Sequence, residues 1–302
     1  MKAVRLQAYG DVDQLRYEDA PDPVPGAGEA LVKIAVSGLN PVDVIVRKGL
    51  FAQVAPLQFP AILGVDAAGT IVAAGTGVTE FAVGDRVVAH LPLNGKGGYA
   101  EMAASPVAGI AKLPSIVTFE AGATLPLVAL TGRQAVDLLG VKRGDRVLVS
   151  GALGAVGRVA VQYLQELGAM PVAGVRAARL AEGRALAGEA LDIDLAPSSP
   201  DFDYAVAAAA PVAANTVKHV RDGGKVASAV QIPEGADDGR PVAVQRFMAH
   251  DDPVVLRRAV DAAARGALTI PISATFRLSE AAEAQKALAQ GPSGKVLLLV
   301  QA

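Results

Sequence analysis

The stretch VLVSGALGAVGRVAVQYLQELGA, residues 147–169, decides the fold, because it places three glycines between an apolar segment and an amphipathic one. Gly151, Gly154 and Gly157 are spaced three apart, and glycine is costly inside regular structure unless the backbone needs it. After them, apolar side chains at i, i+3, i+4, i+7, i+8 and i+11 predict one buried helix face that Gly168 can end. That face comprises Val156, Val159, Ala160, Tyr163, Leu164 and Leu167. The glycines therefore lie in a strand-to-helix turn.

Such a turn can bind the pyrophosphate of a dinucleotide. The helix start offers unpaired N–H groups and a positive dipole end, and residues without side chains let phosphates come close. The spacing is G-x-x-G-x-x-G, with Ala152 at the first glycine of G-x-G-x-x-G. A tight structural turn is the alternative, but the flanking strand and helix favour dinucleotide binding. The predicted cofactor-binding residues of this turn are Ser150, Gly151, Gly154, Ala155, Val156 and Gly157.

The next predicted strand ends in PVAGVRAAR, residues 171–179, and contributes Gly174 to the predicted cofactor site. NAD sites usually carry an acidic residue here, about 20 residues past the glycines, to bind the ribose 2′-hydroxyl. This chain has Arg176 and Arg179 instead, and no Asp or Glu before Glu182. A guanidinium matches a phosphate in charge and geometry, so the two arginines predict the 2′-phosphate of NADPH. Two solvated arginines at a helix start are the alternative.

Composition excludes several classes of function. A chain of 302 residues predicts two domains, and its net charge of -2 supplies no field for nucleic acid or an anionic membrane. The absence of cysteine excludes disulfides, thiolate nucleophiles and cysteine-ligated zinc, and three isolated histidines leave little for a metal site. No apolar run reaches the roughly 18 residues of a membrane span, and the first residues lack the apolar block of a signal peptide. We therefore expect a cytoplasmic protein without a metal.

The pattern of elements changes twice along the chain. In residues 1–118, short alternating segments such as MKAVRL are separated by Pro and Gly clusters, which predicts a mainly antiparallel, barrel-like β domain. In residues 119–270, apolar strands such as RVLVS alternate with Ala-rich helical segments, which predicts βαβ units on a parallel sheet. Residues 271–302 return to short elements, with a helix for which Ser279 is the expected N-cap. The predicted fold class is α/β.

Five segments together make a family resemblance plain. They are GLNPVDVIVRKG (38–49), GVDAAGTIVAAGTGVTEFAVGDRVVA (64–89), ATLPLVALTGRQAV (123–136), GDRVLVSGALGAVG (144–157) and the closing FRLSEAAEAQKAL and GKVLLLV. The sequence resembles the medium-chain dehydrogenase/reductase superfamily, in its zinc-free quinone oxidoreductase branch, the relatives of zeta-crystallin. The resemblance covers nearly the whole chain. It implies a GroES-like β-barrel domain of residues 1–118 and 271–302 around a Rossmann NADPH-binding domain of residues 119–270, a doubly wound parallel sheet. It also implies a nicotinamide in the cleft between the domains, and a homodimer.

The resemblance also suggests catalytic residues. Zinc alcohol dehydrogenases of the superfamily carry a catalytic Cys and a Gly-His-Glu segment, whereas this chain has GLN at 38–40 and Gly64, Val65 and Asp66, so zinc-assisted alcohol oxidation is disfavoured. By resemblance, Asn40 and Asp43 line the cleft, and Asn40 is positioned to bind a carbonyl oxygen. Their alternative role is structural, because Asn-Pro is a turn signal and Asp43 can cap the following helix. The two roles are compatible.

Other positions of the family pattern are less informative. Many quinone reductases of this branch carry tyrosines where this chain has Ile45 and Phe51, so a tyrosine proton donor is missing from that loop. Thr131 matches the segment that packs beside the nicotinamide, although a hydroxyl bonded to its own helix is the alternative. We expect Tyr99 to serve packing and the lone His90 to be structural.

Three functions fit this sequence. The leading one is an NADPH-dependent oxidoreductase that transfers a hydride to a small-molecule quinone or other α,β-unsaturated carbonyl acceptor, which needs chiefly geometry and a donor near the developing charge. An enoyl-thioester reductase is the second, with Arg47, Lys48 and Lys96 as candidates for binding a carrier. The third is an NADPH-binding sensor or structural protein, which would bind the cofactor without turnover.

Overall fold

The computed structural model describes residues 1–300, and the chain forms two compact units. The first unit comprises residues 1–127 and the chain from Asp251 onward, and the second comprises Val128–His250. The first unit contains β1 (Lys2–Leu6), β2 (Leu15–Asp19), β3 (Glu29–Gly38), β4 (Ala61–Ile62), β5 (Asp66–Ala74), β6 (Arg86–His90), β7 (Met102–Pro106), β8 (Ile110–Lys112), β15 (Ile272–Arg277), β16 (Lys295–Leu299), α1 (Pro41–Arg47), α2 (Phe119–Ala123), α7 (Pro253–Ala264) and α8 (Ala281–Ala289). The second contains β9 (Arg146–Ser150), β10 (Met170–Val175), β11 (Glu189–Asp192), β12 (Phe202–Ala207), β13 (Val220–Ser228), β14 (Ala243–Arg246), α4 (Ala155–Glu166), α5 (Leu180–Ala187) and α6 (Ala213–Lys218). Helix α3 (Pro126–Leu139) begins in the first unit and continues into the second.

The boundaries between the units differ from those expected from the sequence. The expected Rossmann domain was residues 119–270, but residues 119–127 and 251–270 lie with the first unit. Helix α2 packs against β3 and β5, and α7 packs against β8, so the apolar faces of both helices are buried on the barrel side. Helical pattern alone does not show on which sheet a helix packs.

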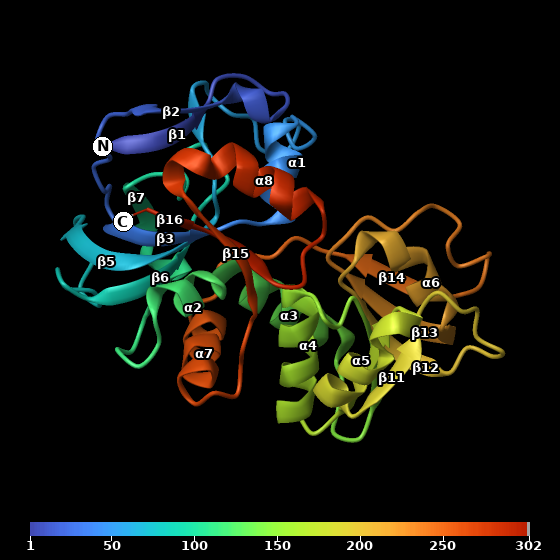
Figure 1. The fold of residues 1–302 in the computed structure, drawn as a ribbon. Coiled ribbons are helices and arrows are strands. Elements are labelled where there is room, and N and C mark those ends of the chain that lie inside the picture. The colour runs from blue at the N-terminus through green and yellow to red at the C-terminus, as the bar shows by residue number, and fades with distance from the viewer. Residues whose placement is uncertain (301–302) are drawn as a thin grey trace. The chain divides into compact units, whose positions relative to one another are not determined.

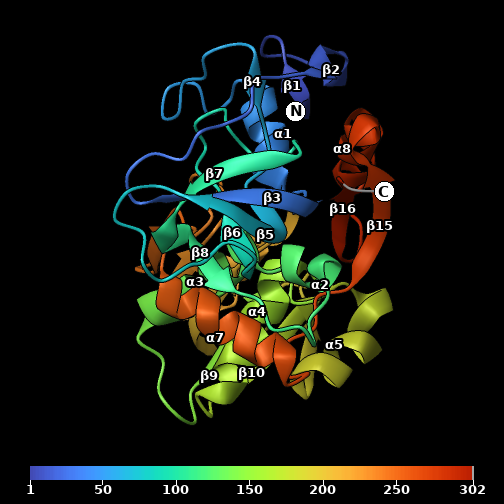
Figure 2. The same cartoon turned by 90° about the vertical axis from the view of Figure 1, so that its left-hand side faces the viewer.

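The first unit is built on a mainly antiparallel sheet in the order β15-β16-β3-β5-β6-β8, with β7 also paired to β3. Within this sheet β15 and β16 pair in parallel, and α8 covers both (Figure 2). The register sets Leu297 of β16 opposite Gly38 of β3, so the last described strand completes a sheet begun early in the chain. This pairing explains why the sequence pattern returns to short strands at its end.

The second unit is a parallel sheet in the order β11-β10-β9-β12-β13-β14, with helices packed on it (Figure 1). Along β9, Val147 and Val149 belong to the core shared with α3 and α4, whereas Leu148 belongs to the core that includes residues of α6. The alternation shows that both faces of the sheet are buried, as doubly wound sheets require. Strand order reverses between β9 and β12, and ligands bind beyond the carboxyl ends of the strands at such a switch point.

Two helix ends test the sequence predictions. Helix α4 ends at Glu166, and Gly168 has φ +73° and donates its N–H to Gln165 O, as expected. The prediction of Ser279 as an N-cap was wrong, because the chain leaving β15 first makes a short 3₁₀ turn, Leu278–Glu280. Glu280 caps that turn by accepting a hydrogen bond from Arg277 N at 2.7 Å. Within residues 1–300, no helix has the length and apolarity needed to cross a membrane.

Candidate functional site

The three glycines of the β9–α4 turn have three different roles. Gly151 has φ +68°, and a Cβ there would lie 2.6 Å from the Ala209 side chain that follows β12. A Cβ on Gly157 would overlap the backbone of Gly151 and Ala152, so Gly157 allows the helix to pack on the turn. Gly154 is exposed, and a Cβ there would meet only Gly151 O, at 3.2 Å. The space over Gly154 is therefore open toward solvent.

The start of α4 has the donors that an anion needs. Gly154 is the N-cap, and the first N–H that bonds back to it is that of Arg158, which donates to Gly154 O at 2.9 Å. The N–H groups of Ala155, Val156 and Gly157 lie ahead of that bond, in the first turn of a helix, where no intrahelical acceptor is available. The open space above Gly154 lies at a helix N-terminus and at the switch point of the sheet. The residues of this turn therefore fit a dinucleotide pyrophosphate.

The other residues predicted for the cofactor site support this turn. Ser150 is fully buried and its hydroxyl donates to Val206 O of β12 at 3.4 Å. Gly174 O accepts the N–H of Gly151 at 3.2 Å, so the second strand fixes the turn through its backbone. Thr131 lies in α3 and is 8% exposed, next to Gly132, where a Cβ would meet Val156 O and Val159 of α4. The structure thus brings α3 against the first turn of α4.

Arginines gather beyond β10. Arg176 has a side chain that is 70% exposed, and its Nε lies 3.7 Å from Asp194 Oδ2. Arg179 donates from Nε and Nη2 to the two carboxylate oxygens of Glu182, at 2.9 and 2.6 Å. Arg158 was not predicted from the sequence; partial burial and the charge of Arg179 lower its pKa. Its position directly after Gly157 was the available signal, because that residue starts the second turn of the helix that follows the glycines.

A second group of polar residues lies inside the first unit, at the start of α1. Asn40 is the N-cap and donates its backbone N–H to Asp43 Oδ2 at 2.8 Å. Both residues are buried. This is the loop-closing arrangement that was the structural alternative for the pair, and it fixes the Asp43 carboxyl inside the protein.

The Asn40 side chain is bound to a buried ion pair. Lys295 Nζ donates to Asp66 Oδ2 at 2.7 Å and to Asn40 Oδ1 at 2.6 Å, and Asn40 Nδ2 donates to Asp66 Oδ2 at 2.9 Å. Lys295 is 3% exposed and Asp66 is fully buried. Asp66 Oδ1 also accepts the N–H of Leu127 at 2.8 Å. The oxygen of Asn40 is therefore taken by an ammonium, and one of its N–H groups by a carboxylate.

The pairing of Lys295 with Asp66 was not predicted from the sequence. The signal was present, because each is a charged residue within an otherwise apolar strand, GVDAAG and GKVLLLV. Charged side chains are almost never fully buried unless they are paired, so two such residues predict one another.

Tyr99 connects to the same cluster. It is fully buried and its hydroxyl donates to Asp43 Oδ2 at 3.1 Å. Burial, with the charge of Asp43 as a second cause, raises the pKa of Tyr99 well above its ordinary value. A Cβ on Gly64 would lie 2.5 Å from the Tyr99 ring, so Gly64, at φ +98°, makes room for it. The expectation that Tyr99 serves packing is confirmed, and its hydrogen bond to Asp43 adds to that role.

Two further polar residues of the sequence analysis have structural contacts. His90 Nδ1 lies 2.7 Å from Asp251 Oδ1. Arg47 was a candidate for binding the carrier of an enoyl thioester, and that prediction was wrong: its side chain is buried, with Nε donating to Gln285 Oε1 at 2.7 Å. A helix C-terminus that packs on α8 buries this arginine, whereas Lys48 and Lys96 are exposed. Residues 1–300 contain no group of three His, Asp or Glu side chains able to hold a metal ion.

Comparison with known proteins agrees with this architecture. The alcohol dehydrogenase GroES-like domain family matches residues 26–115, and the family described as zinc-binding dehydrogenase matches residues 186–298. A chloroplastic quinone-oxidoreductase homolog of Spinacia oleracea is 34% identical over 244 residues, covering 75% of this chain and 74% of that protein. The chain belongs to the medium-chain dehydrogenase/reductase superfamily. Within it, the chain belongs to the quinone oxidoreductase branch.

Other known proteins are also similar to this chain. The quinone oxidoreductase of Coxiella burnetii has a solved structure that superposes with a TM-score of 0.88, at 25% identity, and covers 100% of this chain and 99% of its own. A pikromycin polyketide synthase component of Streptomyces venezuelae is 38% identical over 162 residues, 53% of this chain and 4% of that protein. Membership makes this chain an oxidoreductase that uses a nicotinamide cofactor.

Proposed function

We propose that the protein is an NADPH-dependent, zinc-independent oxidoreductase that transfers a hydride to a quinone or another α,β-unsaturated carbonyl acceptor. The observation that carries the cofactor assignment is the set of arginines beyond β10, where NAD sites have a carboxylate. The 70% exposed side chain of Arg176 is free to turn toward a phosphate, because its Nε is 3.7 Å from its carboxylate partner. Exposed ion pairs at such distances contribute little energy, so a 2′-phosphate can replace Asp194.

Zinc independence is supported by the residues at the two zinc-site segments of the superfamily. Asn40 and Asp66 come from those segments, and their side chains bind the ammonium of Lys295. A bound divalent cation at that place would meet a like charge held at hydrogen-bond distance from both side chains. The ammonium of Lys295 is thus a fixed cation at the place where zinc-dependent relatives need side chains that bind zinc.

We infer the acceptor class from the cofactor and from the family. NADPH, when bound, would supply a hydride, and the protein would orient the reactants and supply a proton. An enoyl thioester is the second candidate acceptor, and part of this chain is similar to a polyketide synthase component. A cytoplasmic location and a homodimer stay predictions made from the sequence and the family.

Turnover assays separate these alternatives. Purified protein is mixed with NADPH, and cofactor oxidation is followed with a simple quinone, an α,β-unsaturated ketone and an enoyl thioester in parallel. We expect turnover with at least one of the first two. Turnover only with the thioester selects the second candidate. Tight NADPH binding without oxidation by any acceptor contradicts the reductase function and supports a sensor or structural role.

A further inference from the structure

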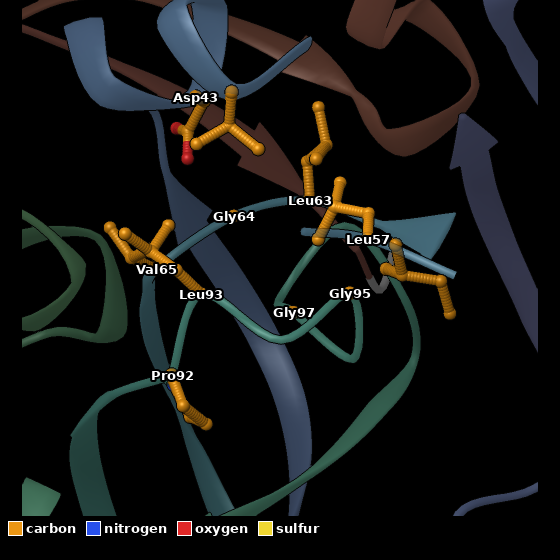
Figure 3. A pocket seen from close by; sticks show the side chains of 11 residues that line it. Asp43, Leu57, Leu63, Gly64, Val65, Pro92, Leu93, Gly95 and Gly97 are labelled. Carbon is orange, nitrogen blue, oxygen red and sulfur yellow. The ribbon is translucent and has the colours of Figure 1, made fainter. Parts of the chain in front are cut away.

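A small pocket in the first unit has one ionisable side chain in its wall. Eleven residues of α1 and of the segments 57–65 and 92–97 line it, and ten of them are apolar residues or glycines. The exception is Asp43. Figure 3 shows its carboxyl directed from α1 toward the chain segment of Gly64 and Val65. The pocket has room for about one water molecule.

The two carboxyl oxygens of Asp43 are in different surroundings. Oδ2 accepts two hydrogen bonds, from Asn40 N at 2.8 Å and from the Tyr99 hydroxyl at 3.1 Å. Oδ1 is buried and has no hydrogen-bond partner among the described residues. An ionised oxygen without a donor is costly inside a protein, whereas a protonated oxygen carries a hydrogen and no charge. The hydrogen of a neutral Asp43 carboxyl therefore belongs on Oδ1.

The charged groups packed around Asp43 agree with a neutral carboxyl. Asp66 on β5 forms an ion pair with Lys295 on β16, so the charge of that ammonium is balanced by Asp66. Tyr99 is neutral, and Arg47, on the same helix as Asp43, is bonded to Gln285 instead. Burial, opposed by the bond from Asn40 and assisted by the charge of Asp66, raises the pKa of Asp43 from 3.8 to about 7.

We propose that Asp43 is the proton store of this oxidoreductase, and that its Oδ1 proton passes through a water molecule in the adjoining pocket to the reduced acceptor. This inference rests on the proposed function. An α,β-unsaturated ketone that gains a hydride at its β-carbon becomes an enolate and needs one proton. The Oδ1–H bond of Asp43 breaks, water relays the proton, and an O–H or C–H bond forms on the enolate. Solvent then returns a proton to the carboxylate.

This store replaces the missing tyrosines of the loop. Ile45 and Phe51 cannot donate a proton, and Asp43 lies only two residues before Ile45 on the same helix. Tyr99 lowers the pKa of Asp43, because its hydrogen bond to Oδ2 stabilises the ionised carboxylate. Loss of that bond makes Asp43 hold its proton to higher pH.

Infrared difference spectroscopy tests the storage without cofactor or acceptor. The wild-type protein is titrated from about pH 5 to about pH 9. It should lose the C=O stretching band of a protonated carboxyl group, with a midpoint near pH 7. Asp43→Asn should lack this band, while Asp19→Asn, at an exposed carboxylate paired with Lys2, should keep it. A wild-type spectrum without such a band overturns the proposal, whatever the enzyme's turnover.

Rate profiles then test the delivery with the acceptor that gave turnover. The wild-type rate should fall above about pH 7, and Asp43→Asn should be about 100-fold slower and lose this dependence, as for loss of a general acid. Tyr99→Phe, which keeps the ring in its place, should move the alkaline fall to higher pH. An Asp43→Asn variant that keeps the wild-type profile overturns the delivery step, as does a Tyr99→Phe profile that does not move. A titrating band without turnover on any acceptor contradicts the proposed function and the delivery, but not the storage.

Discussion

The ammonium of Lys295 lies 2.7 Å from Asp66 Oδ2, and both side chains are buried in the first unit. The pair joins β16, near the end of the chain, to β5, more than 200 residues earlier, and it fixes the side chain of Asn40. Removing one member of a buried pair leaves an uncompensated charge, and this decides what a substitution does.

Lys295→Met should therefore destabilise the protein strongly. The expected loss is about 3–5 kcal/mol in the free energy of unfolding, because Asp66 remains buried without its cation. Urea denaturation measures it. Lys286→Met is the matched control, since Lys286 is exposed and forms its ion pair with the exposed Glu283, and it should cost less than about 1 kcal/mol. Equal effects of the two substitutions would contradict the assignment of a buried pair.

Arg176→Ala should weaken NADPH binding more than NADH binding. The expected change is about tenfold or more in the NADPH dissociation constant, the size of a lost hydrogen bond to a charged group. Isothermal titration calorimetry with both cofactors measures it, and Arg184→Ala, on the exposed side of α5, is the control. Equal losses for the two cofactors would show that Arg176 does not bind the 2′-phosphate.

Two glycine substitutions separate folding from cofactor binding. Gly157→Ala should lower stability by about 1–3 kcal/mol or more, because the new methyl group overlaps the backbone of the turn. Gly154→Ala should cost less than about 1 kcal/mol, since its φ is -77° and its neighbourhood is open. The same Gly154→Ala should still weaken NADPH binding, because its methyl group occupies the space assigned to the phosphates. Unchanged affinity would place the pyrophosphate elsewhere.

Asp43 should make stability depend on pH. Its folded pKa, about 7, lies above the ordinary value of 3.8, so the folded state binds more protons than the unfolded state between these values. Its contribution to the free energy of unfolding is fully present below pH 3.8 and is lost as pH rises through 7. The total loss is up to about 4 kcal/mol. Asp43→Asn should remove this loss. Urea denaturation of both proteins at about pH 5 and about pH 8, on either side of the folded pKa, gives the comparison. The same dependence of the free energy of unfolding on pH in the wild type and in Asp43→Asn would contradict this prediction.

The local pattern of the sequence predicts the second unit well. In the segment 147–169 the pattern correctly predicted a strand, a glycine turn and a helix, which are β9, the turn and α4. The period of apolar residues and the positions of glycines are local properties of the sequence. The domain boundaries were displaced, because α2 and α7 carry helical patterns whose packing partners are distant in sequence.

The buried polar cluster was harder to predict, because it depends on contacts across the chain. Asn40 and Asp43 were selected by resemblance, but Lys295 reaches Asn40 only through the pairing of β16 with β3. Single-sequence patterns contain the charged residues and not the strand order that brings them together. Likewise, Arg47 was a candidate for binding a carrier, and only the packing of α1 against α8 shows that its side chain is buried.

The most direct test of the central claim is to follow the hydride itself. NADPH carrying deuterium at the nicotinamide C4, in each of its two stereochemical positions, is incubated with the protein and an α,β-unsaturated ketone in ordinary water. Mass spectrometry of the saturated product should find one deuterium at the β-carbon with one of the two labelled cofactors. A saturated product without deuterium from either cofactor, or no product while NADPH is bound, would contradict a hydride-transferring reductase.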